Sequence, residues 1–122
     1  MAKKILVADD EPYVLRSIEY TLGKAGYNVT TAVDGEEALK KIHSENPDLV
    51  FLDIQMPKMD GNEVCKALRQ DPAKKDLYVI VITAKGQESE RIFSLECGAS
   101  EYITKPYSPR RMLERVKEIL GE

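Results

Sequence analysis

Long apolar runs and a cysteine framework are both missing from this sequence of 122 residues. The first apolar run, Ile5–Ala8, ends at Asp9 and is too short for a signal-peptide core or a membrane span. Cys65 and Cys97 lie far apart without CxxC spacing, which predicts free, partly buried thiols and neither a disulfide nor a metal site. We therefore expect a soluble, cytoplasmic protein without a membrane partner.

An excess of positive charge is also missing. The formal net charge is -3 and the pI is near 5.3, whereas non-specific binding to nucleic-acid phosphates needs clustered Lys and Arg. The densest basic stretch, residues 110–117, contains Glu114 and is typical of a solvated helix face. No direct nucleic-acid contact is expected.

The single histidine, His43, falls on the outer face of a predicted helix and is interpreted as solvated surface.

Five short apolar runs recur at intervals of about one βα unit, and the length fits a single domain over residues 1–122. Most of the runs are continuously apolar, which is typical of parallel strands covered on both faces. The second and fifth runs are more polar and suit the edges of a sheet. The predicted strands are Ile5–Ala8, Val29–Ala32, Leu49–Leu52, Tyr78–Ile82 and Tyr102–Thr104.

Between these runs the apolar spacing becomes helical, and capping residues mark where the helices begin. Asp34 with Glu37 forms a capping-box-like pair, and Ser108-Pro109 is an N-cap followed by proline at the first helical position. The fourth helix is expected from about Gln87 to Cys97, with Ile92 and Leu95 facing inward. The core-facing residues of the other helices are predicted to be Val14, Leu15, Ile18 and Leu22; Ala38, Leu39 and Ile42; Val64 and Leu68; and Met112, Leu113, Val116, Ile119 and Leu120.

Alternating strands and helices predict a parallel sheet with right-handed crossovers and helices on both faces. The expected fold class is therefore α/β: a doubly wound, flavodoxin-like, three-layer sandwich with five strands in the order 2-1-3-4-5 and five helices. In such sheets a ligand binds beyond the carboxyl ends of the first and third strands, where the strand order reverses.

Polar residues stand at the carboxyl ends of four predicted strands. They are Asp9 and Asp10 after the first, Asp53 after the third, Thr83 at the end of the fourth and Lys105 after the fifth. Three crowded carboxylates repel one another, and a divalent cation relieves that repulsion. Mg²⁺ prefers oxygen ligands and commonly shares one or two carboxylates with a phosphate, so an open acidic rim suits it, with Mn²⁺ as an alternative ion.

A carboxylate, Mg²⁺, one lysine and one hydroxyl are a sufficient set for phosphoryl transfer, which depends on positioning and charge neutralisation. Asp53 is the candidate nucleophile, because it leaves the most apolar strand and a carboxylate can form a covalent aspartyl phosphate.

The chain resembles the response-regulator receiver domains of two-component signalling, including the single-domain receivers of chemotaxis. The resemblance covers essentially the whole chain and is carried by Val7–Glu11, Asp53–Gly61, Val81–Ala84, Gly98–Ala99 and Tyr102–Tyr107. It implies that Asp53 is the phosphoacceptor and Lys105 its partner for the phosphoryl oxygens. It further implies that Asp10 and the backbone carbonyl of Gln55 bind Mg²⁺ directly, with Asp53 beside the ion, and that Asp9 binds it largely through water.

The resemblance also implies a switch. Thr83 would hydrogen-bond the phosphoryl group, and Tyr102 would follow it inward and repack the face formed by the fourth helix, fifth strand and fifth helix.

The resemblance also implies a cis Lys105-Pro106 bond. Gln55 and Lys85 stand where chemotaxis-type receivers commonly have Asn and Glu, so the lifetime of the phosphorylated state does not follow from the resemblance. The small Ala84 leaves room for small phosphodonors.

The leading hypothesis is a phosphorylation-controlled interaction module charged by a sensor histidine kinase. Phosphotransfer and autodephosphorylation would be self-catalysed and stoichiometric, so the protein would not be an enzyme in its own right. A protein target would bind the face of the fourth and fifth helices, and the module would be a monomer or a phosphorylation-dependent dimer.

Three alternatives stay open at this level. The chain could be the receiver of a longer transcription regulator. It could be a phosphatase of the haloacid dehalogenase type, although that family has a second Asp where this chain has Gln55. It could bind a flavin or nucleotide on the same fold, although neither GxGxxG nor GxxxxGK[ST] occurs and an acidic rim repels phosphate.

Overall fold

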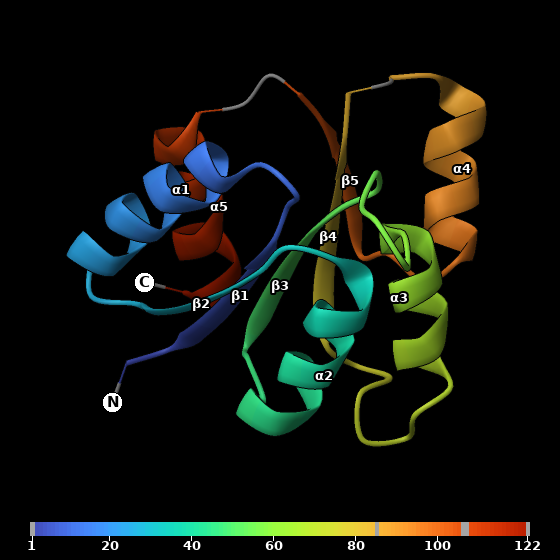
Figure 1. Cartoon of the computed structure of the whole chain (residues 1–122), viewed down its shortest axis with the longest axis horizontal. Helices are drawn as coiled ribbons and strands as arrows, with labels where there is room; N and C mark the ends of the chain where they lie inside the picture. Colours follow the sequence, from blue (N-terminus) through green and yellow to red (C-terminus); the bar gives the residue numbers. More distant parts are fainter. Residues whose placement is uncertain (1, 85, 106–107, 122) are drawn as a thin grey trace.

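Strands and helices alternate along the whole chain in the computed structural model, which describes residues 2–84, 86–105 and 108–121 (Figure 1). The strands are β1 (Lys4–Ala8), β2 (Asn28–Ala32), β3 (Leu49–Asp53), β4 (Tyr78–Thr83) and β5 (Glu101–Thr104). The helices are α1 (Pro12–Lys24), α2 (Gly35–Glu45), α3 (Gly61–Arg69), α4 (Glu88–Glu96) and α5 (Pro109–Leu120). Among the described residues, no helix has both the length and the apolar character needed to cross a membrane.

The sheet is fully parallel and has the order β2-β1-β3-β4-β5, which confirms the predicted topology. Its central strands β1, β3 and β4 are buried over nearly their whole length, whereas the edge strands β2 and β5 are mostly half-buried. Asp53 and Thr83 are the last residues of β3 and β4, so the sheet fixes the backbone of both residues at its rim.

Two apolar layers cover the sheet, because successive side chains of a strand point to opposite faces. On one face α1 and α5 pack against alternate strand residues such as Val7 and Phe51. On the other face α2 and α3 pack against the intervening residues, such as Leu6 and Leu52. Figure 1 shows the resulting layers, with α1 and α5 together on one side of the sheet and α2, α3 and α4 on the other. Cys65 and Cys97 are free thiols buried in the second layer, as expected.

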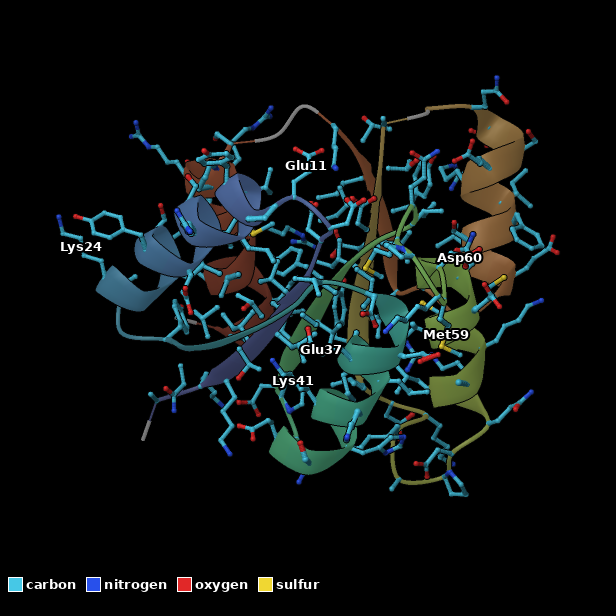
Figure 2. The ribbon with its side chains drawn as sticks, viewed as in Figure 1. Glu11, Lys24, Glu37, Lys41, Met59 and Asp60 are labelled. Carbon is cyan, nitrogen blue, oxygen red and sulfur yellow. The ribbon has the colours of Figure 1, made fainter. Side chains whose placement is uncertain are left out.

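The predicted helix caps are present. The Asp34 carboxylate accepts from the Glu37 amide at 2.8 Å, and Glu37 accepts in turn from the amide of Val33. Ser108 caps α5 as predicted, and Asp60 with Glu63 forms a further, complete capping box at the start of α3 that the sequence analysis did not include. Each cap satisfies backbone donors that a helix leaves unpaired in its first turn. Along α2, Glu37 and Lys41 stand one turn apart and are half-buried, and Lys41 Nζ donates to the carbonyl of Thr31 in β2; Figure 2 labels both residues.

The predicted orientation of α4 is wrong. Ile92 and Leu95 were expected to face inward, but 45% and 37% of their surfaces are exposed, and Phe93 is 50% exposed. The side of α4 that meets the domain carries Ser94, which is fully buried, and continues to Cys97 at the C-cap. The apolar spacing of α4 therefore marks its outer surface, because its inner surface uses small and polar residues.

A close backbone approach fixes the loop that follows β3. A Cβ atom at Gly35, the first residue of α2, would overlap the carbonyl oxygen of Met59 and lie 2.6 Å from its carbonyl carbon. Figure 2 labels Asp60 near the start of α3 and Met59 further along that helix in the view. The loop is also tied to α2 by an ion pair of Lys58 with Asp34 at 3.8 Å. The start of α2 therefore supports the loop between β3 and α3.

Replacing Gly35 tests this contact against a matched glycine. We expect Gly35→Ala to lower the free energy of unfolding by about 1–3 kcal/mol, because the methyl group displaces backbone. Gly23 lies in exposed helix with no atom within 4 Å of an added Cβ, so Gly23→Ala should raise it by up to about 1 kcal/mol. Urea denaturation of the wild type and both variants gives the free energies of unfolding. Equal changes in the two variants would contradict the close contact between Gly35 and Met59.

Candidate functional site

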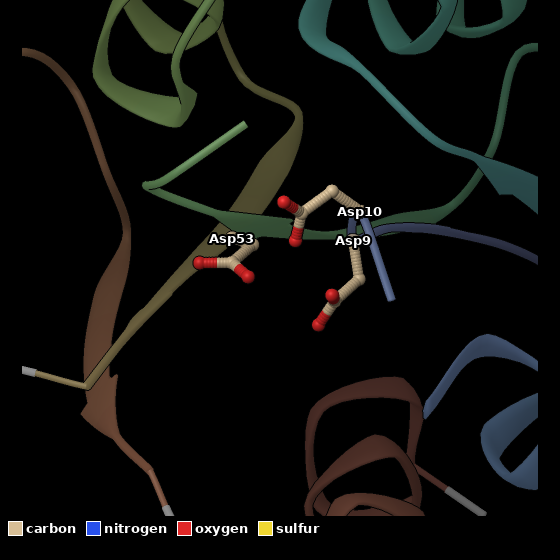
Figure 3. A group of neighbouring side chains, drawn as sticks. All are labelled: Asp9, Asp10 and Asp53. Atoms are coloured by element: carbon tan, nitrogen blue, oxygen red, sulfur yellow. The ribbon is translucent and has the colours of Figure 1, made fainter. Parts of the chain in front are cut away.

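Three carboxylates meet at the carboxyl ends of β1 and β3. Ligand atoms of Asp9, Asp10 and Asp53 all lie within 4.8 Å of one another, the separation at which one cation can contact all three. Figure 3 shows Asp9 and Asp10 leaving the end of β1 beside Asp53 at the end of β3. Asp9 and Asp53 are 2% and 4% exposed, and Asp10 is open to solvent. The cluster is therefore anchored in the domain and accessible from one side.

Lys105 brings one positive charge to this cluster from the end of β5. Its Nζ lies 2.9 Å from Asp53 Oδ2 and 3.5 Å from Asp9 Oδ2. The Lys105 amide donates to the carbonyl of Thr83 at 2.7 Å, which fixes the start of the lysine side chain beside β4. One ammonium group faces three carboxylates, so the site retains an excess of negative charge that a divalent cation would complement.

The crowding is visible in the acid–base properties of two groups. Burial raises the pKa of the Asp9 carboxyl above its ordinary value of 3.8, a hydrogen bond from the Glu11 amide opposes this, and the charge of Asp53 adds to it. Burial alone would lower the pKa of Lys105, but its hydrogen bond to Asp53 and the charges of Asp9 and Asp53 outweigh burial and raise it. Lys105 is therefore firmly cationic, and an ionised Asp9 is held at a cost to stability.

The Asp53 carboxylate is held at both oxygens. Oδ2 accepts from Lys105, and Oδ1 accepts from the amide of Gln55 at 3.2 Å. The backbone beyond Asp53 turns so tightly that a Cβ at Gly61 would lie 2.6 Å from the Asp53 carbonyl oxygen. The Asp53 side chain therefore has a fixed orientation in a packed turn.

Thr83 and Tyr102 lie on the two strands beyond Asp53. Thr83 ends β4 one residue after Ile82, the register partner of Asp53, and is 1% exposed. Tyr102 is half-buried on β5, where it pairs in register with Val81. Burial, followed by the charge of Glu90, raises the pKa of the Tyr102 phenol. Both predicted switch residues therefore lie along a path from the acidic rim to β5.

Sequence reasoning missed one residue at this site. Glu90 of α4 accepts a hydrogen bond from the Thr83 hydroxyl at 3.2 Å. No spacing or motif pointed to it, because Glu90 is one of two acidic residues in the first turn of α4, and nothing in the sequence distinguishes it from Glu88. Two further expectations, the cis Lys105-Pro106 bond and the position of Lys85, lie outside the residues that the structure describes.

Removing the Asp9 charge should stabilise the protein in the absence of divalent cations. The raised pKa means that an ionised Asp9 lowers folded stability, and this loss develops as the pH rises through the folded-state pKa. In a chelator-containing buffer near pH 7, Asp9→Asn should raise Tm by a few degrees. The gain should shrink as the pH falls through the folded-state pKa and disappear below 3.8, where the carboxyl is protonated in both states. A variant less stable than the wild type at pH 7 would contradict this assignment.

Comparison with known proteins identifies relatives over nearly the whole chain. The family model described as "Response regulator receiver domain" matches residues 5–117. The alkaline phosphatase synthesis transcriptional regulatory protein PhoP of Bacillus subtilis is 52% identical over 98% of this chain and 49% of its own length. A probable transcriptional regulator, ycf27, of Guillardia theta is 45% identical over 97% of this chain and 45% of its own. The chain thus spans about half the length of these curated relatives.

Solved structures agree in fold. A putative response regulator from Chloroflexus aurantiacus superposes with a TM-score of 0.89 at 38% identity, covering all of both chains. A CheY-like receiver domain protein from Methanospirillum hungatei superposes with a TM-score of 0.90 at 35% identity, covering 99% of this chain and 95% of its own. With the flavodoxin-like order of its sheet and the family match over residues 5–117, this chain belongs to the response-regulator receiver domains of two-component signal transduction.

Proposed function

We propose that this receiver accepts a phosphoryl group on Asp53 from a sensor histidine kinase, with Mg²⁺ bound beside it. The observation that carries the proposal is the arrangement around Asp53. Its carboxylate contacts Lys105 at 2.9 Å and belongs to a cluster of three acidic side chains open to solvent on one side. These are the groups that phosphoryl transfer needs: an acceptor, a fixed cation and oxygen ligands for a metal ion.

In the proposed reaction an oxygen of Asp53 attacks the phosphorus of the donor phosphohistidine. A P–O bond forms as the P–N bond breaks, and the imidazole leaves with the electron pair. Lys105 would follow the phosphoryl oxygens with its ammonium group, and Thr83 would offer its hydroxyl as a donor. The chain's own groups orient the acceptor and neutralise charge, so the transfer is stoichiometric and no separate catalytic base is required.

The acidic cluster fits a magnesium ion by its chemistry. A bound Mg²⁺ would neutralise carboxylate and phosphoryl charge together. Asp10 and Asp53 would hold it directly with the backbone carbonyl of Gln55, and Asp9 would act largely through water. The exposed position of Asp10 leaves space for the water ligands that Mg²⁺ usually keeps. Mn²⁺ would bind the same oxygens.

Phosphorylation would act on a partner through α4, β5 and α5. A groove of about 610 Å³ lies there, lined by residues that include Arg91, Tyr102, Arg111 and Arg115. Its lining contains the proposed switch residue Tyr102, so a change that starts at Asp53 and passes through Thr83 would reshape it. Phosphorylation adds about -1.5 to -2 charges at the acceptor. The target would be a protein or a second copy of this chain, in the cytoplasm.

A transcriptional output is a second candidate, favoured by the named relatives. PhoP of Bacillus subtilis is a transcriptional regulatory protein about twice as long as the segment matched here. We propose that this receiver works as one unit over residues 1–122 and controls such an output. DNA contacts, where they occur, would belong to the output and not to the acidic receiver surface.

Replacing Asp53 tests the acceptor. With Mg²⁺ and a small phosphodonor such as acetyl phosphate, the wild type should gain one phosphoryl mass that hydroxylamine removes, and Asp53→Asn should show none. Asp76→Asn is the matched control, because Asp76 is exposed and precedes β4 at the opposite end of the sheet. Asp76→Asn should label like the wild type. Labelling retained in Asp53→Asn would refute the proposed acceptor.

Magnesium binding has its own signature in stability. A ligand that binds only the folded state stabilises it by about 2.7 kcal/mol at a hundred times its dissociation constant. Wild-type protein should therefore gain stability as Mg²⁺ is added, and Asp10→Asn should need a concentration at least about tenfold higher for the same gain, because a charged ligand is lost. Thermal denaturation in Mg²⁺ titrations measures this, with K⁺ at equal ionic strength as control. Superimposable wild-type and Asp10→Asn titrations would reject Asp10 as a ligand.

A further inference from the structure

The side of α4 that meets the domain is unusually polar. Glu90, Ser94 and Cys97 follow at spacings of four and three residues, so they share one face of the helix. Ser94 is fully buried, and its hydroxyl has no hydrogen-bond partner among the described residues. The apolar side chains Ile92, Phe93 and Leu95 lie outward. Little apolar burial therefore holds α4 in place, and each polar contact on its inner face carries more weight.

Glu90 makes such a contact with the end of β4. Its carboxylate accepts from the Thr83 hydroxyl at 3.2 Å, and Thr83 is almost completely buried. A hydrogen bond to an ionised acceptor in a buried position is stronger than one between neutral groups. Glu90 also lies near enough to Tyr102 for its charge to affect that phenol. One carboxylate on α4 thus acts on Thr83 and Tyr102, both proposed switch residues.

We propose that Glu90 is a positioning residue that holds Thr83 and α4 in the unphosphorylated arrangement. This inference rests on the proposed phosphorylation of Asp53. A threonine hydroxyl has one proton, so Thr83 can donate to Glu90 or to a phosphoryl oxygen but not to both. Phosphorylation would therefore draw the Thr83 hydroxyl away from Glu90, and α4 would lose a contact that its inner face does not replace.

The energetic consequence follows from a two-state equilibrium. A contact made only in the resting arrangement lowers the apparent affinity for anything that binds the activated arrangement. Removing the hydrogen bond between Thr83 and Glu90 should therefore tighten the binding of a phosphoryl mimic, although in this proposal Glu90 contacts neither Mg²⁺ nor the phosphoryl group. A charge-assisted hydrogen bond of ordinary strength corresponds to a change of about tenfold.

The experiment titrates wild type, Glu90→Gln and Glu90→Ala with beryllofluoride, an aspartyl-phosphate mimic, at saturating Mg²⁺. Glu90→Gln keeps the size of the side chain and removes its charge, whereas Glu90→Ala also removes the acceptor. Glu96→Gln is the matched control, since Glu96 is an exposed glutamate on the same helix. Amide NMR spectra of Thr83, Ala84 and Tyr102 report the arrangement before and after beryllofluoride is added.

We expect Glu90→Ala to bind beryllofluoride about tenfold more tightly than wild type, Glu90→Gln to fall between them, and Glu96→Gln to match wild type. Without beryllofluoride, the Thr83 and Tyr102 signals of both Glu90 variants should already lie along the line that joins the free and bound wild-type positions. A general loss of stability would not move the signals along that line. Unchanged or weaker binding by both Glu90 variants would overturn the proposal.

The same titration separates this inference from the proposed function. A wild type that does not respond to beryllofluoride, or a response that persists in Asp53→Asn, would overturn both. A wild type that responds through Asp53, with Glu90 variants identical to it in affinity and in resting spectra, would overturn only the role of Glu90.

Discussion

The parallel register of the sheet is the constraint on which the rest of the molecule depends. Because all five strands run the same way, their carboxyl ends open on one edge, and side chains from β1, β3, β4 and β5 gather there although they are far apart in sequence. The buried central strands make that register hard to shift, since a slip of one residue would turn every apolar side chain to the wrong face. The position of Asp53 relative to Lys105 and Asp9 is therefore set by core packing.

The same edge concentrates charge that the folded chain does not neutralise by itself. Asp9 and Asp53 are almost fully buried, and Lys105 supplies one positive charge between them. The raised pKa of Asp9 records first its lost hydration and then its repulsion by Asp53. A well-packed apolar group at position 9 would remove that penalty, and would also remove an oxygen that we propose as a ligand of Mg²⁺, largely through water. The acidic cluster thus costs folded stability, a cost common at functional sites, and the proposed binding of a cation and a phosphoryl group would account for keeping it.

Most of the fold and the acidic cluster could be predicted because each depends on local or topological rules. Continuous apolar runs identified the buried strands, and the alternation of elements fixed the order of the sheet. The strand ends then placed Asp9, Asp10 and Asp53 together, as the structure has them. The orientation of α4 could not be predicted in this way. Ile92 and Leu95 have the spacing of a buried stripe, but the fully buried residue of α4 is Ser94, and both of these apolar side chains are exposed. Glu90 escaped notice for the same reason, since its importance depends on which side of α4 faces Thr83.

An element that must respond to one hydrogen bond cannot also be held by a large apolar contact. Helices α1 and α5 each bury apolar side chains such as Ile18 and Val116 completely, and a change of a single hydrogen bond would not move them. Helix α4 differs, because Ser94 is its one fully buried residue and its apolar side chains lie outward. Its position is therefore governed by interactions of the size that Thr83 can make or withdraw. The polar inner face that defeated prediction is the property that would let α4 respond to chemistry at Asp53.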